Sequence, residues 1–213
     1  MSRFSHSARI AELIEDWIHS YRLNGQLLRP SELVRELARL CYQHIDYIVL
    51  QRSLLSPFPE IPARIPIDIR DFTYSDIEAV RLMDRPSEAK LCAKRLDFGQ
   101  MGLVALHNGQ PIGYVWACGK IEPAIERVQL NLKPLEILCT DAFTAPAFRG
   151  KRVQPALTLA LYEKAREQGY ENTVAIVDSL NAPSLAVLAK LGAERIAALD
   201  YYRIGVWRWT KFR

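Results

Sequence analysis

Cysteine and histidine are scarce in this chain of 213 residues, and neither type is clustered. The four cysteines show no C-x-x-C spacing and have no histidine pair nearby, which argues against a structural zinc site and a disulfide framework. The four histidines are too dispersed to make a metal site. We therefore predict a protein without a metal, whose thiols are buried in a reducing cytoplasm.

Long apolar runs and a strong net charge are also missing. No window reaches 18 apolar residues, and the opening M-S-R-F-S-H-S has no apolar segment typical of a signal peptide, so neither a membrane span nor secretion is indicated. The net charge of +4 suits an anionic ligand but is too weak to indicate nucleic acid by itself. RNA binding through the basic tail, residues 203–213, is a weaker alternative.

Three widespread catalytic motifs, G-x-x-x-x-G-K-[ST], G-x-S-x-G and H-E-x-x-H, do not occur. The sequence therefore gives no sign of P-loop phosphate binding, of α/β-hydrolase chemistry or of zinc-protease chemistry.

The composition that is present, 49% hydrophobic and 24% charged, is ordinary for a globular protein with a buried core. Apolar residues at helical spacing predict an amphipathic helix over 10–21 and a second helix from Pro30, whose apolar stripe ends at a structural His44. Residues 47–55 are rich in β-branched and aromatic types and predict a strand. Four prolines between 57 and 66 forbid regular structure. We divide the chain into an N-terminal helical addition with one strand (1–56), a proline-rich connector (57–66) and a main domain (67–213).

Strands and helices alternate in the main domain. A capping box at Thr73–Asp76 predicts a helix start, and Asn108-Gly109 predicts a type I′ hairpin. The continuous apolar run Asn172–Asp178 predicts a central strand covered on both faces. The other expected elements are strands at 67–70 and 135–143, helices from Val153 to Gly169 and from Asn181 to Gly192, and a closing hairpin or long strand over 196–211.

The most informative stretch is Asp141–Leu157, which reads D-A-F-T-A-P-A-F-R-G-K-R-V-Q-P-A-L. It leads from an apolar strand through a proline-bounded turn into an amphipathic helix. A helix N-terminus offers backbone N–H groups without intrahelical partners and the positive end of the macrodipole, so it favours an anion such as a pyrophosphate. Arg149, Lys151 and Arg152 add full positive charges at the same place.

From about Ile67 to the C-terminus, the order of these motifs resembles the GNAT superfamily of acyl-CoA-dependent N-acyltransferases. The matching residues are Pro146, Phe148, Arg149, Gly150, Lys151, Asn181, Ser184, Lys190, Leu191 and Gly192. The resemblance implies an α/β fold (α+β by some schemes) with a mixed, twisted central sheet and helices on both faces. It also implies that a CoA pyrophosphate lies on the backbone amides of Arg149, Gly150, Lys151, Arg152, Val153 and Gln154.

In the family fold, two parallel strands separate at a β-bulge, and the thioester lies in the wedge between them. Carried across to this chain, the strands are 135–144 and 172–178. Asn181 and Ser184 are then candidate contacts to the pantetheine, whose arm and thioester carbonyl would also be held by the backbone of three residues of the first strand, Ala142, Phe143 and Thr144.

Acyl transfer to an amine requires a base that takes a proton from the ammonium. Asp141 and Glu136 are the candidates beside the wedge, and Asp141 is nearer to the thioester. Strand alternation sends these two carboxylates to opposite faces unless the bulge changes the register.

The chain departs from the family pattern at Arg152 and Gln154, where the pattern asks for small residues. We expect this loop to keep αR-like angles and Arg152 to direct its guanidinium at phosphate. The family's general acid, a tyrosine in the helix after the asparagine, is replaced by Leu188. Tyr202, or its neighbour Tyr201, is the candidate substitute. Alternatively no acid is needed, because a thiolate is already a fair leaving group.

We therefore predict a GNAT-type N-acetyltransferase or acyltransferase with acetyl-CoA or another acyl-CoA as donor and a small-molecule amine as acceptor. The N-terminal helices would cover the acceptor pocket or build a homodimer. The alternative, motivated by Leu188, Arg152 and Gln154, is a catalytically inactive module of the same fold that binds CoA or a protein partner.

Overall fold

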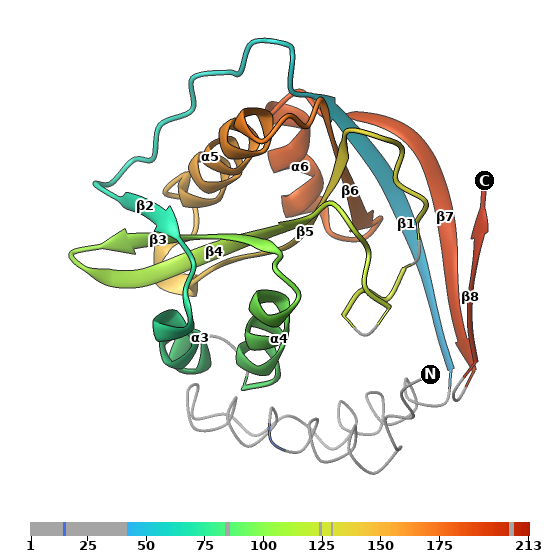
Figure 1. Cartoon of the computed structure of the whole chain (residues 1–213), viewed down its shortest axis with the longest axis horizontal. Coiled ribbons are helices and arrows are strands. Elements are labelled where there is room, and N and C mark those ends of the chain that lie inside the picture. Colours follow the sequence, from blue (N-terminus) through green and yellow to red (C-terminus); the bar gives the residue numbers. More distant parts are fainter. Residues whose placement is uncertain (1–14, 16–41, 84–85, 124, 129, 205–206) are drawn as a thin grey trace.

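A strongly twisted sheet of eight strands runs through the computed structural model, in the order β2-β3-β4-β5-β6-β1-β7-β8 (Figure 1). The structure describes residues 15, 42–83, 86–123, 125–128, 130–204 and 207–213. β5 and β6 pair in parallel, and the other neighbours are antiparallel. The predicted mixed sheet is therefore confirmed.

The strands are β1 (Tyr42–Ser53), β2 (Asp68–Asp71), β3 (Met101–His107), β4 (Gln110–Cys118), β5 (Glu136–Thr144), β6 (Asn172–Asp178), β7 (Glu194–Ile204) and β8 (Trp207–Phe212). The described α-helices are α3 (Ile77–Met83), α4 (Pro86–Asp97), α5 (Val153–Glu167) and α6 (Ala182–Lys190), with short 3₁₀ turns at Tyr74–Asp76 and Pro146–Phe148.

The two faces of the sheet are covered by different helices, as predicted. We call the face that packs against α5 and α6 the α5 face; its core contains Leu157 and Leu161 of α5 and Leu188 of α6. We call the opposite side the α4 face, since Ala89 and Cys92 of α4 pack there. β6 contributes buried residues to both faces, which confirms it as a central strand.

Local signals placed most elements of the main domain correctly. Asn108 and Gly109 have φ angles of 51° and 75°, both positive, so the β3–β4 turn is the predicted type I′ hairpin. The Asp76 carboxylate accepts a hydrogen bond from the Thr73 backbone N–H at 2.8 Å, as in a capping box. The chain closes with the β7–β8 hairpin.

Among the described α-helices, α4 is the one that we did not predict. It begins at Pro86, a favoured first helical residue, and carries Glu88 in its first turn and Lys94 and Arg95 in its last. It buries Ala89, Cys92 and Arg95 at helical spacing against the α4 face. A buried arginine is unusual, and its partners become important at the candidate site.

β1 is built into the middle of the sheet, although it belongs to the N-terminal segment. It pairs with β6 on one side and with β7 on the other. Its start at Tyr42 corrects our placement of His44 on a helix: His44 lies in β1, opposite Tyr202 of β7. Strand pairing with β7 therefore overrides the helical spacing that His44 shares with the residues before it. The predicted helix over 10–21, the rest of the second helix and Cys41 lie outside the described residues.

From β1 the chain crosses over α5 to reach β2, and we call residues 54–67 the strap (Figure 1). Phe58 of the strap contacts Tyr162 of α5 with a ring-centroid distance of 6.1 Å, and the Arg166 guanidinium lies 4.6 Å from the Phe58 ring centroid. The proline-rich segment is thus an extended crossing tied down by aromatic contacts.

Candidate functional site

β5 and β6 separate partway along their length. Their register runs from Glu136 opposite Asn172 to Cys139 opposite Ala175 and ends there. β5 continues to Thr144 without pairing to β6. The unpaired ends form the wedge, which is the opening that we predicted between these two strands.

A bulge in β5 lies where the wedge begins. Cys139 pairs with Ala117 and Ala142 pairs with Val115, so Thr140 and Asp141 together stand opposite the single residue Trp116. An extra residue in one strand reverses the alternation of the side chains that follow. Phe143 consequently packs with Tyr114 on the α4 face, at a ring-centroid distance of 5.6 Å.

The bulge places Asp141 on the same face as Glu136. Leu138 packs on the α4 face, which puts Glu136 there too, and Asp141 shares that side with Phe143. The Asp141 charge accordingly raises the pKa of the Cys92 thiol on α4, adding to the larger effect of burial. Of the two alternatives left open by the sequence, the register change is the one that the structure shows.

Thr140, the other bulge residue, is held by the buried arginine of α4. Arg95 Nη1 lies 2.8 Å from Thr140 Oγ1, 2.8 Å from Gln100 Oε1 and 2.7 Å from Glu126 Oε1. The Arg95 side chain is 4% exposed and the Glu126 side chain 14%. This buried ion pair connects α4, the bulge and the loop between β4 and β5, and no local sequence pattern indicated it.

Glu136 lies at the other end of β5, where the strands are still paired. Its Oε1 accepts a hydrogen bond from Gln51 Nε2 at 2.9 Å and its Oε2 accepts one from the Lys133 backbone N–H at 2.8 Å. The structure therefore does not bring Glu136 to the wedge together with Asp141. Its contacts fix the entry of the chain into β5.

Ala142, Phe143 and Thr144 line the wedge from the β5 side. They pair with β4 only, so the edge of their backbone that faces β6 carries no ladder. The Thr144 hydroxyl donates to Gln154 Oε1 at 3.1 Å. Gln154, at one of the two departures from the family pattern, therefore fastens the first turn of α5 to the end of β5.

Residues 145–152 form the turn between β5 and α5, where the sequence predicts that an anion binds. We call this turn the anion loop. Gly150 has φ 75°, and Arg152, the residue that precedes α5, has φ 60° and ψ 23°. The expectation of αR-like angles is therefore wrong at Arg152, which is left-handed. A non-glycine residue in this region costs about 1–2 kcal/mol.

The first turn of α5 keeps donors for an anion. The Arg152 side chain does not cap the helix and the first turn holds no acidic residue. Pro155 has no N–H, so Val153 and Gln154 supply the backbone donors of this turn. Arg149 Nε donates to the Thr144 carbonyl at 3.1 Å, and the Lys151 ammonium lies 5.0 Å from the Phe148 ring centroid.

Sequence reasoning missed one cation at this loop. The backbone N–H of Arg64, in the strap, donates to the Lys151 carbonyl at 2.8 Å, and the Arg64 side chain is exposed. The strap thus adds a fourth basic residue beside Arg149, Lys151 and Arg152. The sequence analysis described the strap only as a connector, because a proline-rich segment does not indicate which element it packs against.

α6 begins beside the far side of the wedge. The Asn181 side chain caps it by accepting a hydrogen bond from the Ser184 backbone N–H at 3.2 Å, and both residues are at least partly accessible. Leu188 is buried in the core of the α5 face. Leu188 therefore has a packing role at this position. Contacts from Asn181 or Ser184 to pantetheine stay a prediction.

Tyr202 lies away from the wedge. It is on β7, separated from β6 by β1, and its ring stacks between His44 and Trp209 at centroid distances of 4.6 and 5.3 Å. Its neighbour Tyr201 packs on the α4 face, so alternation places Tyr202 on the opposite side from Asp141. The structure does not bring Tyr202 and Asp141 together, and its role as an acid stays a prediction.

Three of the four cysteines are described, and all three are buried and free. Cys139 is the one nearest the wedge, at the last paired position of β5. Burial raises the pKa of its thiol to about 12. Because only the thiolate is a good nucleophile, Cys139 is not suited to form a covalent acyl intermediate at neutral pH.

Within the described ranges, no cluster of three or more His, Cys, Asp or Glu side chains has the arrangement of a metal site. None of the helices there is both long and apolar enough to span a membrane.

The comparisons with known proteins identify the family of the main domain. The model of the acetyltransferase (GNAT) family matches residues 67–193. The search of curated proteins found no match.

Three solved structures are similar to this chain, and the two with TM-scores above 0.5 illustrate the likeness of fold. A GCN5-related N-acetyltransferase from Sphaerobacter thermophilus is 16% identical with a TM-score of 0.55, and 85% of this chain covers 56% of that one. A tandem GNAT protein from the clavulanic acid biosynthesis pathway is 16% identical with a TM-score of 0.53, and 89% of this chain covers 60% of it. A ribosomal-protein-alanine N-acetyltransferase from Brucella melitensis is 20% identical with a TM-score of 0.48, over 64% of this chain and 98% of that one.

Proposed function

Because the chain belongs to the acetyltransferase (GNAT) family, we propose that it transfers an acyl group, most simply acetyl, from an acyl-CoA to an amine of a small molecule. The observation that carries the proposal is the position of the wedge. The strand that borders the wedge, β5, leads directly into the anion loop at the N-terminus of α5. The wedge suits the thioester at one end of an acyl-CoA, on its pantetheine arm. The anion loop suits the pyrophosphate at the other end.

The donor would be held by backbone groups and by charge. The N–H groups of Val153 and Gln154 lie in the first turn of α5, which directly follows the basic residues of the loop, and the Arg64 backbone of the strap is bonded to that loop. The free edge of Ala142, Phe143 and Thr144 offers donors and acceptors to the amide groups of pantetheine. Exposed Asn181 lies at the opposite border of the wedge.

Transfer is direct in this proposal, since Cys139 holds its proton. The Asp141 carboxylate accepts a proton from the ammonium of the acceptor, directly or through a water molecule. The amine nitrogen then attacks the thioester carbonyl, the new C–N bond forms as the C–S bond breaks, and the nitrogen loses its surplus proton to solvent while solvent protonates the departing CoA thiolate. The buried thiols also fit a reducing compartment, and we propose the cytoplasm as the location.

A second function is favoured by one observation. Leu188 is buried where the family has its acidic tyrosine, so a catalytically inactive module that binds CoA or a protein partner would show the same fold and the same loop. The two functions differ in turnover, and they agree in donor binding only where the inactive module binds CoA.

Titration of the purified protein with CoA, acetyl-CoA and a medium-chain acyl-CoA tests donor binding. We expect micromolar dissociation constants by calorimetry, and the order of affinity reports the chain length that the wedge accepts. Release of free thiol from acetyl-CoA in the presence of a panel of amines then separates the enzyme from the inactive module. Absence of binding by all three would refute the enzyme and would leave an inactive module that binds a protein partner.

Substitution of Arg152 separates its backbone strain from its charge. We expect Arg152→Gly to stabilise the fold by about 1 kcal/mol, because glycine adopts φ 60° without strain, and to weaken CoA binding roughly tenfold through loss of a charge-assisted contact. Arg152→Asn is the matched control, since asparagine tolerates this conformation but has no charge. Urea denaturation and calorimetry measure the two effects. Tighter CoA binding by Arg152→Gly would show instead that the arginine obstructs the loop.

A further inference from the structure

We propose that single-stranded RNA binds on the outer face of β1, β7 and β8, with its bases on exposed aromatic rings and its phosphates beside unpaired cations. The inference does not depend on the proposed acyl transfer. It adds a second binding site outside the wedge, and it develops the RNA alternative that the basic tail indicated in the sequence.

Three rows of side chains cross these strands on one face of the sheet. Residues directly opposite each other in neighbouring strands share a face, and so do alternate residues of one strand. The rows are Tyr42, Ile204 and Trp207; His44, Tyr202 and Trp209; and Asp46, Asp200 and Lys211. We call this surface the aromatic face. It is the side opposite Tyr201, which packs on the α4 face.

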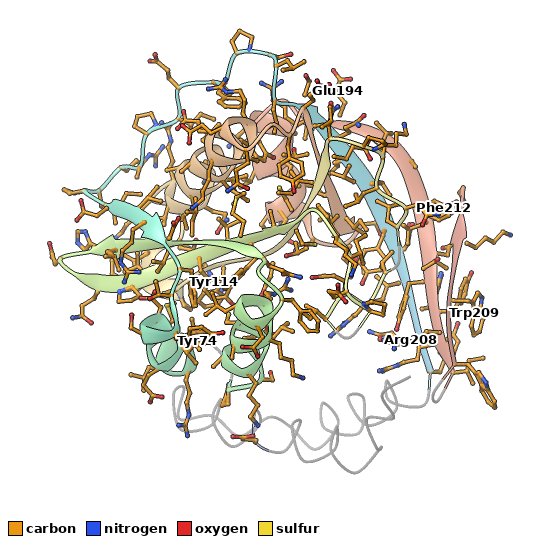
Figure 2. The ribbon with its side chains drawn as sticks, viewed as in Figure 1. Tyr74, Tyr114, Glu194, Arg208, Trp209 and Phe212 are labelled. Atoms are coloured by element: carbon orange, nitrogen blue, oxygen red, sulfur yellow. The ribbon has the colours of Figure 1, made fainter. Side chains whose placement is uncertain are left out.

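The outer rings of the aromatic face are open to solvent. Tyr42 is 55% exposed, Trp207 73% and Trp209 45%. Single exposed aromatic residues are ordinary, but neighbouring ones on the same face of a sheet mark an interaction surface. Figure 2 shows the Trp209 side chain at the outer margin of the β7–β8 hairpin, away from the middle of the molecule. The aromatic face is therefore accessible to a partner outside the chain.

The second row is a continuous stack of rings with one ring face left open. The His44 and Tyr202 rings have a centroid distance of 4.6 Å and an interplanar angle of 8°, and the Tyr202 and Trp209 rings 5.3 Å and 14°. β8 is the last strand of the described sheet, so no further strand there covers the other face of Trp209 (Figure 1). A nucleobase can continue the stack at this position, because every base has a π face.

The two carboxylates of the aromatic face are already paired. Arg213 Nη2 lies 2.5 Å from Asp46 Oδ1, and Arg213 Nε lies 3.0 Å from Asp200 Oδ2. His44 Nε2 lies 2.9 Å from Asp200 Oδ1. These contacts offset the negative charges, so the acids do not repel a phosphate as free carboxylates would.

The cations of β8 have no such partners. In the portion of the chain that the structure describes, neither Lys211 nor Arg208 forms an ion pair, and both residues are exposed. Alternation places Lys211 on the aromatic face and Arg208 on the opposite one. Because β8 is the edge strand, a phosphate chain that follows the edge meets positive charge from both sides.

RNA satisfies both features of this surface better than other occupants do. A second copy of the chain that paired along β8 would bring the cations of the strand close to those of its copy, which is unfavourable. An acidic peptide would match the charge and leave the open ring faces without a partner. RNA supplies bases and phosphates together. It is also the single-stranded nucleic acid of the cytoplasm, the compartment that we propose for this protein.

The test measures binding of a fluorescein-labelled decauridylate by fluorescence anisotropy at low salt. Saturating CoA is present, because it keeps phosphates away from the anion loop. The competitors are unlabelled decauridylate, inorganic polyphosphate and polyglutamate, matched in charge. We expect decauridylate to displace the probe at a concentration roughly tenfold lower or less than the other two, since it alone supplies bases for the rings.

The tryptophan variants assign this preference to the aromatic face. We expect Trp207→Ala and Trp209→Ala each to weaken binding of decauridylate roughly 10- to 100-fold and to leave the affinity for polyphosphate unchanged. Phe98→Ala is the matched control, because it removes a ring that is 50% exposed just after α4 and should keep the full affinity. Lys211→Gln should reduce the slope of log affinity against log salt by about 0.7. Urea denaturation checks that each variant folds.

Full affinity for decauridylate in both tryptophan variants, or no measurable binding by the wild type, would overturn the proposal. Equal displacement by polyphosphate or polyglutamate would also overturn it and indicate a general polyanion site. A dimer in sedimentation that Trp207→Ala dissociates would show instead an interface between copies. Acyl transfer is judged without RNA, by thiol release from acetyl-CoA, so either proposal can fail while the other stands.

Discussion

Replacing Asp141 by asparagine is expected to lower kcat about 100-fold or more while leaving the dissociation constant of acetyl-CoA within twofold of the wild-type value. Asparagine has nearly the same shape but cannot take the proton from an ammonium, and a positioned general base contributes about 10²–10⁴-fold. Donor binding depends on the anion loop and the β5 edge, which the substitution does not touch. Steady-state kinetics with a saturating amine and calorimetry with acetyl-CoA measure the two quantities.

Glu136→Gln is the informative comparison, because it makes the same chemical change on the same strand and the same face. Glu136 is buried and held by Gln51 and Lys133, so its substitution should lower the free energy of unfolding by about 1–3 kcal/mol and change kcat much less than Asp141→Asn. A larger fall in kcat for Glu136→Gln than for Asp141→Asn would transfer the role of base to Glu136.

Most elements of the main domain could be predicted because their signals are local. Asn108-Gly109 has few alternatives to a tight hairpin turn, and Asn181 followed by Pro183 fixes the start of α6 within two residues. His44 failed for the opposite reason. Its helical spacing is a local pattern, whereas its strand conformation depends on pairing with β7, more than 150 residues away.

Only the parts of the candidate site that consist of backbone elements could be predicted from the sequence. The turn before α5 and the wedge follow from the order of the elements, so the strand with Ala142 to Thr144 and the turn with Arg149 to Gln154 form as predicted, while their contacts to a donor stay a prediction. Features that depend on long-range contact were missed or left open. Arg64, which reaches the loop by way of the strap, was missed. The effect of the bulge on Asp141 was left open, because the bulge is defined only by its partner strand, at Trp116.

The second large effect is expected from Arg95→Met, which should lower the free energy of unfolding by about 3–5 kcal/mol. The substitution leaves Glu126 as a largely buried carboxylate without its guanidinium partner, and breaking a buried ion pair in this way is far more costly than replacing both partners. Urea denaturation at neutral pH measures the change. A loss below about 1 kcal/mol would mean that the ion pair is effectively solvated.

The double variant Arg95→Met, Glu126→Gln distinguishes stability from positioning. It removes both charges, so we expect it to recover most of the lost free energy of unfolding. It cannot restore the contact to Thr140, because methionine has no donor. Since Thr140 and Asp141 form the bulge together, a base displaced by a fraction of an ångström should keep kcat at least tenfold below wild type even when the fold is stable. A double variant with wild-type kcat would show that the ion pair serves folding alone, and that β4 pairing by itself is enough to hold the bulge in place.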